Sequence, residues 1–311
     1  MSCMLSKKGI SYGGLITVII VWGVDPIVNA YFYQYFSPTV LTAISTFFPA
    51  LFFTVFALKK LPLLNIDYFK IAVPISLLNG VACLIQKIGL KYTTPATYAF
   101  LEHLSCVMVP LSLLLIFKKK PRTSEWVAAG LCFLGCFILC GVGGGSFFFG
   151  IGEILCGGAG ILLGLCIVLT GIYVGKLDVS LYMMIYMWVY FFVSLFLSFG
   201  LDRITANGVP LETLMYSTDP LPLISLILFG FLDIGLCWLL RTNAAVHLSP
   251  NVVSVFSPFA AVVTGVTSVL LGTDQLSFRL SVGGSIIFVA LLLSALNSFR
   301  KSKPSPPSTS T

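Results

Sequence analysis

Long apolar runs alternate along the chain with short segments that carry charged or turn-forming residues. A helix that crosses a bilayer needs about 20 mostly apolar residues. The predicted spans cover residues 9–33, 38–58, 71–91, 95–117, 124–142, 147–175, 179–200, 220–241, 250–271 and 280–299. The pattern therefore predicts an all-α membrane protein with ten transmembrane helices, and residues 201–219 form the longest, hydrated connector.

Composition agrees with this pattern. Of the 311 residues, 58% are hydrophobic and only 9% are charged, which excludes an ordinary soluble domain. The net charge of +7 does not indicate a nucleic-acid partner, because the lysines and arginines lie between apolar runs and form no aromatic-interleaved patch. The expected surroundings are a lipid bilayer.

The basic residues also predict an orientation. With a cytoplasmic N-terminus, fourteen of the eighteen Lys and Arg residues lie on the inner side, and only Lys87, Lys91, Arg203 and Arg279 do not. This bias obeys the positive-inside rule and predicts a multi-pass plasma-membrane protein with both termini in the cytoplasm. Residues 300–311 are rich in Pro and Ser and should form a disordered cytoplasmic tail.

Two halves of five helices each are expected at residues 1–143 and 144–299. Because five is odd, homologous halves must be inverted relative to each other. The segment NGVACLIQKIGLKYTT in the first half corresponds to FGFLDIGLCWLLRTNAAVHLSP in the second. Aligning Gly80 with Gly230 also pairs Lys91 with Arg241.

Short motifs resemble those of a known transporter group. VWGVDP runs from Val21 to Pro26, SPTVL begins at Ser37, and YTTPA and HLSPN lead into the fourth helix of each half. Together they resemble the EamA type of the drug/metabolite transporter superfamily, whose repeats carry Trp-Gly in the first helix and a Pro that opens the second. The resemblance implies a ten-helix, inverted-repeat transporter that exports or imports amino acids, metabolites or related small solutes.

Several positions depart from the family pattern. Ser45-Thr46-Phe47 stands where the second helix often has an Arg, and Lys118 to Lys120 replace a Gly-Glu after the fourth. Cys106 stands in place of a Pro that Pro258 retains in the ninth helix. Substrate and coupling mode therefore do not follow from the resemblance.

Carboxylates inside predicted spans are the first candidates for function. An ionisable group at the bilayer centre costs about 2.5–3.5 kcal/mol on insertion scales, so it normally faces a cavity or a partner. Asp25 lies beside Pro26, which could open the first helix, and Trp22 is one turn earlier. A cavity role and a structural ion pair are both open for Asp25. Asp233 needs a partner from another helix, whereas Glu153 and Lys87 are expected near the outer surface.

Polar stripes follow several predicted helices at helical spacing: Asn79, Cys83 and Gln86; Tyr98, Glu102 and Ser105; and Asn251, Ser254, Ser257, Ala261, Thr264 and Ser268. They suit either hydrogen bonds between helices or the lining of a pathway. The predicted substrate pathway comprises Trp22, Asp25, Asn79, Gln86, Tyr98, Glu102, His103, Asp233, Trp238, Ser254 and Ser257.

Glu102 is the candidate for proton coupling, because burial in a partly dry cavity favours the protonated acid and lets it bind and release a proton as the cavity opens. His103 lies about 100° around the same helix and is as well explained by packing. The alternative function is a membrane-embedded enzyme that uses Glu102 and His103 on a lipid-soluble substrate, although no nucleophile or metal constellation accompanies them.

Two further motifs favour packing. Cys132, Cys136 and Cys140 share a helical face but lack His or acidic neighbours, so we expect no metal site. Gly160 and Gly164 form a GxxxG motif that serves either the contact between the halves or a homodimer, so monomer and dimer both stay open. No nucleotide or cofactor motif occurs, and the expected partners are a small solute, lipid and, as a candidate coupling ion, the proton.

Overall fold

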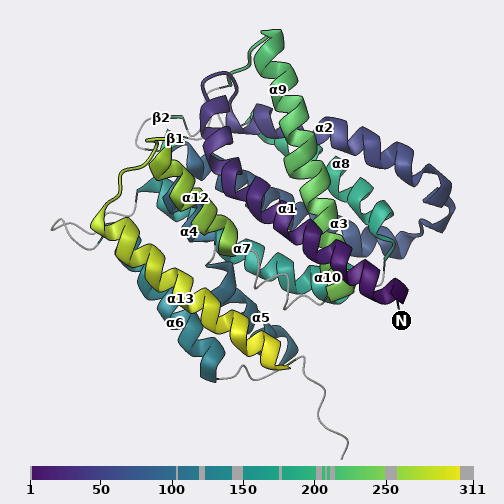
Figure 1. The fold of residues 1–311 in the computed structure, drawn as a ribbon. Helices are drawn as coiled ribbons and strands as arrows, with labels where there is room; N and C mark the ends of the chain where they lie inside the picture. Colours follow the sequence, from purple (N-terminus) through teal and green to yellow (C-terminus); the bar gives the residue numbers. More distant parts are fainter. Residues whose placement is uncertain are drawn as a thin grey trace, which may run out of the picture.

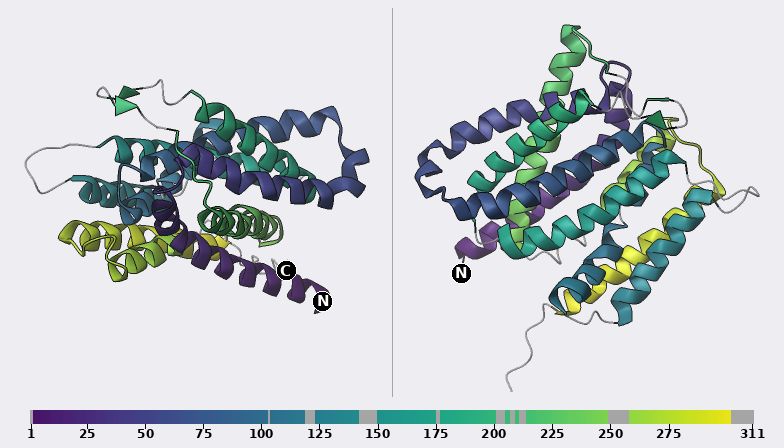
Figure 2. Two further views of the ribbon diagram at one scale, coloured as in Figure 1. Left: turned by 90° about the horizontal axis from the view of Figure 1, so that it is seen from above. Right: turned by 180° about the vertical axis from the view of Figure 1, so that it is seen from behind.

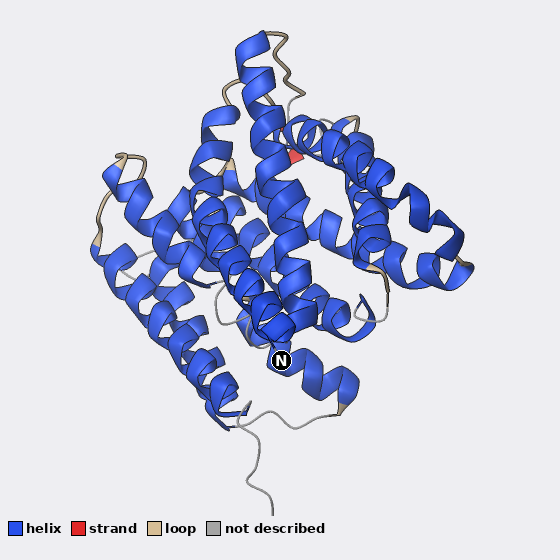
Figure 3. Ribbon diagram, turned by 45° about the vertical axis from the view of Figure 1, so that its right-hand side comes forward, coloured by secondary structure: helices blue, strands red, loops and turns tan. Residues whose placement is uncertain are grey.

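The computed structural model describes residues 2–102, 104–118, 123–141, 150–174, 177–200, 205–206, 209–210, 214–248 and 258–301. This part of the chain is helical apart from one short hairpin, β1 (Thr205–Ala206) with β2 (Val209–Pro210) (Figure 3). The helices of the first half are α1 (Ser2–Phe32), α2 (Pro38–Ala57), η1 (Leu58–Leu63), α3 (Ile66–Leu90), α4 (Pro95–Glu102), α5 (Ser105–Phe117) and α6 (Thr123–Gly141). Those of the second half are α7 (Ile151–Tyr173), α8 (Val179–Ser198), α9 (Pro220–Gly230), the π-helix η4 (Phe231–Cys237), α10 (Trp238–Leu248), α12 (Pro258–Leu270) and α13 (Phe278–Lys301).

Helix boundaries follow simple local signals. Pro38 and Pro220 open α2 and α9, where a missing backbone N–H costs nothing. Asn65 and Asp178 cap α3 and α8 by accepting hydrogen bonds from backbone N–H groups of the first turn. Gly272, with φ of +73°, follows α12, since glycine enters this left-handed conformation without a steric penalty.

Six helical stretches among the described residues are long and apolar enough to cross a membrane, and three shorter apolar helices accompany them. The six are Ser11–Phe32, Pro38–Leu63, Ile66–Leu90, Ile151–Thr170, Val179–Ser198 and Pro220–Ala244. Large apolar side chains such as Val55, Phe196 and Leu270 are exposed on the outside of the bundle. Such a surface suits lipid, so the chain is an integral, multi-pass helical membrane protein.

Three predicted spans differ in detail from the observed helices. The fourth, expected to run unbroken over 95–117, consists of α4 and α5 with a turn at Leu104. The eighth contains the π-helical segment between α9 and α10. The sixth, predicted over residues 147–175 and long enough to tilt or break, includes the continuous helix α7.

Long helices from the two halves lie side by side (Figures 1 and 2). α2 packs on α8, α6 on α13 and α3 on α7, while α1 contacts both α10 and α12. The largest apolar core joins α2, α3, α7 and α8, with Phe53, Leu84, Leu181 and Met183 among its fully buried side chains. The start of α1, the link between α2 and α3 and the end of α13 lie toward the same end of the bundle (Figure 1).

The GxxxG motif of α7 faces inward. A Cβ added to Gly160 would lie 2.6 Å from the backbone oxygen of Leu101, and one added to Gly164 would lie 2.6 Å from the Cβ of Met108. The two glycines therefore let α7 approach α4 and α5 closely. Of the two uses expected for the motif, the structure has the contact within the chain.

Candidate functional site

α1 carries the first polar residues of the site into the bundle. Asp25 and Asn29 lie one turn apart and are buried, and the amide of Asn29 donates a hydrogen bond to the Asp25 carboxylate. Pro26 does not open the helix, because α1 is continuous from Ser2 to Phe32. The one-turn spacing thus places two polar side chains on the same inward face.

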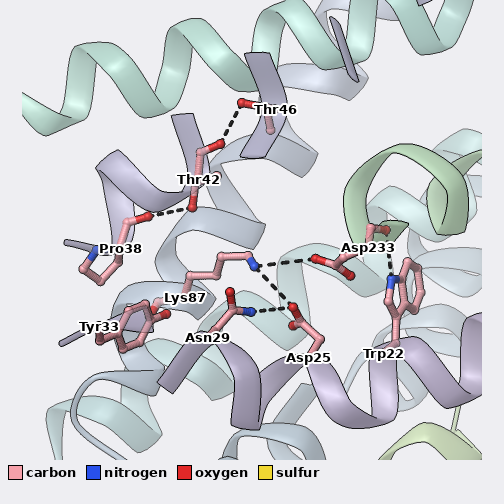
Figure 4. Close-up of polar contacts among 9 residues, drawn as sticks. All are labelled: Trp22, Asp25, Asn29, Tyr33, Pro38, Thr42, Thr46, Lys87 and Asp233. Atoms are coloured by element: carbon pink, nitrogen blue, oxygen red, sulfur yellow. Dashed lines mark hydrogen bonds and ion pairs between the residues drawn. The ribbon is translucent and has the colours of Figure 1, made fainter. Parts of the chain in front are cut away.

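Lys87 is the centre of a buried ion cluster (Figure 4). Its Nζ lies 3.7 Å from Oδ1 of Asp25 and 3.9 Å from Oδ2 of Asp233. Lys87 is only 6% exposed, so its side chain is buried in the bundle and is not hydrated at the outer surface. The reason is energetic: two buried carboxylates need a cation, and α3 supplies it between α1 and η4.

Asp233 lies within the π-helix η4, and Figure 4 shows its side chain facing Lys87. Its side chain meets Lys87 and also interacts with the carboxyl group of Asp25. Its backbone oxygen accepts a hydrogen bond of 3.4 Å from Nε1 of Trp22. π-helical segments are rare and often occur at functional sites. The partner that the sequence required for Asp233 therefore comes from both α1 and α3.

Arg241 lies among aromatic rings. Its guanidinium carbon is 5.5 Å from the ring centre of Trp22 and 5.1 Å from that of Trp238, and the two indoles are 5.4 Å apart. The predicted span over residues 220–241 ends at Arg241, and the positive-inside count places this residue on the inner side. The structure instead gives its guanidinium two aromatic neighbours, which favour a cation electrostatically.

A ladder of tyrosines on α8 continues this aromatic surface. Tyr182, Tyr186 and Tyr190 repeat every four residues and are all buried, and Tyr186 lies 5.1 Å from Trp238 between ring centres. The ring centres of Tyr186 and Tyr190 are 5.9 Å apart. The hydroxyl groups of Tyr186 and Tyr190 and Nε of Arg241 are buried without a hydrogen-bond partner in the described part of the chain.

Glu102 is the last residue of α4 and is partly buried. It lies beside the amide of Gln86 and interacts electrostatically with Arg241. Tyr98, one turn earlier, is buried. Glu102 therefore faces the same region as Arg241, although the two come from different halves of the chain.

Some of the remaining predicted residues have packing contacts, and others lie outside the described part of the chain. Asn79 is buried on α3 and accepts a hydrogen bond from the Cys83 thiol, and Thr264 of the ninth-helix stripe donates one of 2.7 Å to the backbone oxygen of Gly23, which is a packing role. His103, Ser254 and Ser257 lie outside the described residues, as do the side chains of Cys132, Cys136 and Cys140. Glu153, expected to be hydrated near the surface, accepts a hydrogen bond of 2.6 Å from Thr93.

Among the residues that meet at this site, the sequence identified Trp22, Asp25, Asp233 and Trp238. It did not identify Lys87, Arg241 or the tyrosines of α8 as site residues. The sequence did contain a spacing signal for Lys87 and for the α8 tyrosines. Lys87 continues the four-residue spacing of Asn79 and Cys83, and the tyrosines of α8 keep the same spacing. Arg241 had no such signal, because only the tertiary fold brings both indoles to it.

Comparison with known proteins supports the architecture. Residues 8–141 match the model of the EamA-like transporter family. A solved structure titled "Crystal structure of protein" matches with a TM-score of 0.63 and 14% sequence identity, and the alignment covers 96% of this chain and 99% of that one. At this identity the likeness is one of fold. No curated protein matches the sequence.

Proposed function

We propose that the chain, whose residues 8–141 match the EamA-like transporter family of the drug/metabolite transporter superfamily, moves a small metabolite or amino-acid-like solute by alternating access. The observation that carries this proposal is the Lys87 cluster with Asp25 and Asp233. Three charged groups buried among membrane helices are costly, and in membrane proteins they mark solute and ion pathways. The cluster joins helices of both halves, which must move relative to each other in such a mechanism.

The proposal includes ten membrane helices in two inverted halves, residues 1–143 and 144–299. In this proposal α1 corresponds to α7, α3 to α10, and α4 with α5 to α12. The contacts match: α3 packs on α7 as α10 packs on α1, and α4 and α5 pack on α7 as α12 packs on α1. Gly80 contacts Tyr190 of α8, and its aligned counterpart Gly230 contacts Ser45 of α2. Contacts exchanged in this way are expected of two repeats related by a two-fold axis.

The substrate pathway is proposed to pass between Glu102, Arg241, Trp22 and Trp238, with Asp25 and Asp233 at its side. Glu102 is the proposed proton-coupling group. It is the carboxylate of the site that does not contact Lys87 at ion-pair distance among the described residues, and its charge is opposed by Arg241 from the other half of the chain. A proton on Glu102 removes that charge and changes how the site holds a solute.

Transport into proteoliposomes under an imposed pH gradient tests this coupling. Glu102→Gln keeps the shape of the side chain and removes its titration, so gradient-driven uptake should fall to the level of protein-free vesicles while solute exchange without a gradient persists. Asp67→Asn, at an exposed residue of α3, is the matched control and should transport as the parent does. A Glu102→Gln variant that still responds to the gradient as the parent does would show that Glu102 is not the coupling group.

A further inference from the structure

Three buried hydrogen-bonding groups of the site have no hydrogen-bond partner among the described residues. These are the hydroxyls of Tyr186 and Tyr190 and Nε of Arg241. Tyr186 and Tyr190 are each 1% exposed, and buried polar groups in proteins are almost always hydrogen-bonded. All three groups can donate, and Arg Nε can only donate. Arg241 Nε therefore requires an acceptor atom, and a ligand with acceptor oxygens can satisfy all three groups.

The three groups belong to one continuous surface. Trp238 lies beside both Arg241 and Tyr186, and Tyr190 follows Tyr186 one turn along α8. The guanidinium carbon lies 5.5 Å and 5.1 Å from the two indole centres, and the guanidinium group is itself planar, with its donors in a fixed fork. That planar arrangement suits a carboxylate, which can accept two hydrogen bonds from one guanidinium.

The charges of Arg241 and Glu102 indicate whether the ligand is an anion. Glu102 on α4 interacts electrostatically with Arg241, and the described titratable groups that also do so include Cys83 on α3 and Tyr182 and Tyr186 on α8. Glu102 in turn is influenced by Arg241, by Asp25 on α1 and by Lys87 on α3. An ionised Glu102 balances Arg241, whereas a protonated Glu102 leaves the positive charge of Arg241 available to an anion.

Building on the proposed transport function, we infer that Arg241, Tyr186 and Tyr190 bind the carboxylate of a small organic anion, and that this anion binds together with a proton on Glu102. The indoles of Trp22 and Trp238 and the ring of Tyr186 provide an apolar contact for the body of the molecule. A dianionic phosphate fits less well, because Lys87, the other buried cation near the site, is already shared by Asp25 and Asp233. The two binding events favour each other by the same factor, as linkage requires.

Binding of benzoate to the purified full-length chain in nanodiscs, measured by calorimetry, tests the inference. Benzamide has a similar shape without the charge and should bind at least about tenfold more weakly. The benzoate affinity should fall by up to about tenfold for each unit of pH above the value at which Glu102 ionises. Glu102→Gln should keep benzoate binding but make it independent of pH between about 5 and 8.

Variants separate the binding groups from a general loss of charge. Arg241→Gln should weaken benzoate binding at least about tenfold, and Tyr186→Phe, which removes only a hydroxyl group, should weaken it several-fold. Lys70→Gln removes the same charge at an exposed position of α3 and should bind as the parent does. Because Arg241→Gln could disturb the fold, Arg241→Lys is measured as well. Lysine keeps the charge but loses the bidentate contact, so the benzoate affinity of Arg241→Lys should lie between those of the parent and Arg241→Gln.

Several results would overturn the inference. These are equal binding of benzamide and benzoate, undiminished binding by both Arg241→Gln and Tyr186→Phe, or no binding of acetate, benzoate or phenylacetate. Binding of laurate but of none of the short acids would assign the site to a lipid carboxylate and would overturn the solute assignment. Transport of neutral or cationic solutes without carboxylate binding would remove this inference and leave the transport function intact. Carboxylate binding without transport of any solute would contradict the transport function and leave the binding site in place.

Discussion

At the scale of single residues, the position of Lys87 depends on its partners more than on its place in the sequence. Near the end of α3, a lysine could extend to water along its flexible stem. It instead points inward between Asp25 and Asp233, and only 8% of its side chain is exposed. A lysine held in this way neutralises part of the buried negative charge that α1 and η4 carry.

Replacing this lysine should destabilise the fold. Lys87→Met keeps most of the volume but leaves two carboxylates without their cation, and removing one partner of a buried ion pair typically costs about 3–5 kcal/mol. The Tm of the purified chain in detergent should fall accordingly. Lys91→Met, at an exposed residue one turn later, should change the Tm little.

Neutral carboxamides should then restore part of the loss. In the Lys87→Met background, Asp25→Asn together with Asp233→Asn removes the uncompensated charges, so the Tm should rise again. A Lys87→Met variant as stable as Lys91→Met, or a triple variant less stable than Lys87→Met alone, would contradict the account of the cluster as an ion pair.

The sequence identified Asp25 and Asp233 because a charge within an apolar run is conspicuous. It did not identify Lys87 as their partner, because Lys87 lies near a helix end, where a solvated lysine is common. Arg241 raised the same difficulty. Which charges meet depends on helix packing, and Asp25 and Asp233 come from the first and the second half of the chain.

At the scale of elements, α7 offers a matched pair of glycines. A Cβ on Gly160 would meet the Leu101 oxygen at 2.6 Å, whereas one on Gly158 would have nothing within 4 Å. Gly158→Ala should therefore stabilise the chain by up to about 1 kcal/mol through helix propensity. Gly160→Ala should instead lower the Tm, because α7 and α4 must move apart. Equal Tm changes in the two variants would argue against close packing of α7 on α4.

The start of α8 gives a pH-dependent prediction. Burial alone would raise the pKa of Asp178, but the hydrogen bond from Lys60 and those from the backbone of Leu181 and Ser180 outweigh it and hold the pKa below its ordinary value of 3.8. A lowered folded-state pKa means that the stabilisation is complete above the unfolded-state pKa and disappears as pH falls through the folded-state pKa.

Asp178→Asn isolates this ion pair, because asparagine still caps the helix. At neutral pH the variant should lose about 0.2–1 kcal/mol, as partly exposed pairs do. The Tm difference from the parent should stay constant down to about pH 5 and shrink below about pH 4. A difference that grows on acidification would contradict this assignment.

Helix breaks were the least predictable elements. The apolar run over residues 95–117 has no Pro or Gly near Leu104, so nothing local indicates that α4 ends at Glu102. The π-helix at Asp233 likewise follows a glycine that lies against Ser45 of α2, a contact the sequence does not reveal. By contrast, the caps at Asn65 and Asp178 and the Pro residues that open α2 and α9 are local signals that the sequence shows directly.

At the scale of the whole molecule, membrane character and helical class followed from composition and run length, and the family resemblance is confirmed over residues 8–141. The orientation is a separate prediction. Lys119 and the C-terminal tail should be cytoplasmic, and the 201–219 connector should be outside, because basic residues concentrate on the inner side.

Single-cysteine labelling of intact cells in a cysteine-free background measures this orientation. An impermeant maleimide should modify position 210 and leave position 119 unmodified until the membrane is opened. Modification of position 119 but not of position 210 from outside would reverse the orientation.

Alternating access is the central claim, and counterflow in proteoliposomes tests it most directly. Vesicles that contain the purified chain and no nucleotide are loaded with an unlabelled solute and diluted into a trace of the same solute in labelled form, for a panel of carboxylates, amino acids and neutral metabolites. A carrier that exposes one site to each side in turn should make at least one labelled solute accumulate transiently above its equilibrium level. Alternating access would be contradicted if every solute that enters simply equilibrated without this overshoot. It would also be contradicted if no solute entered faster than it enters protein-free vesicles.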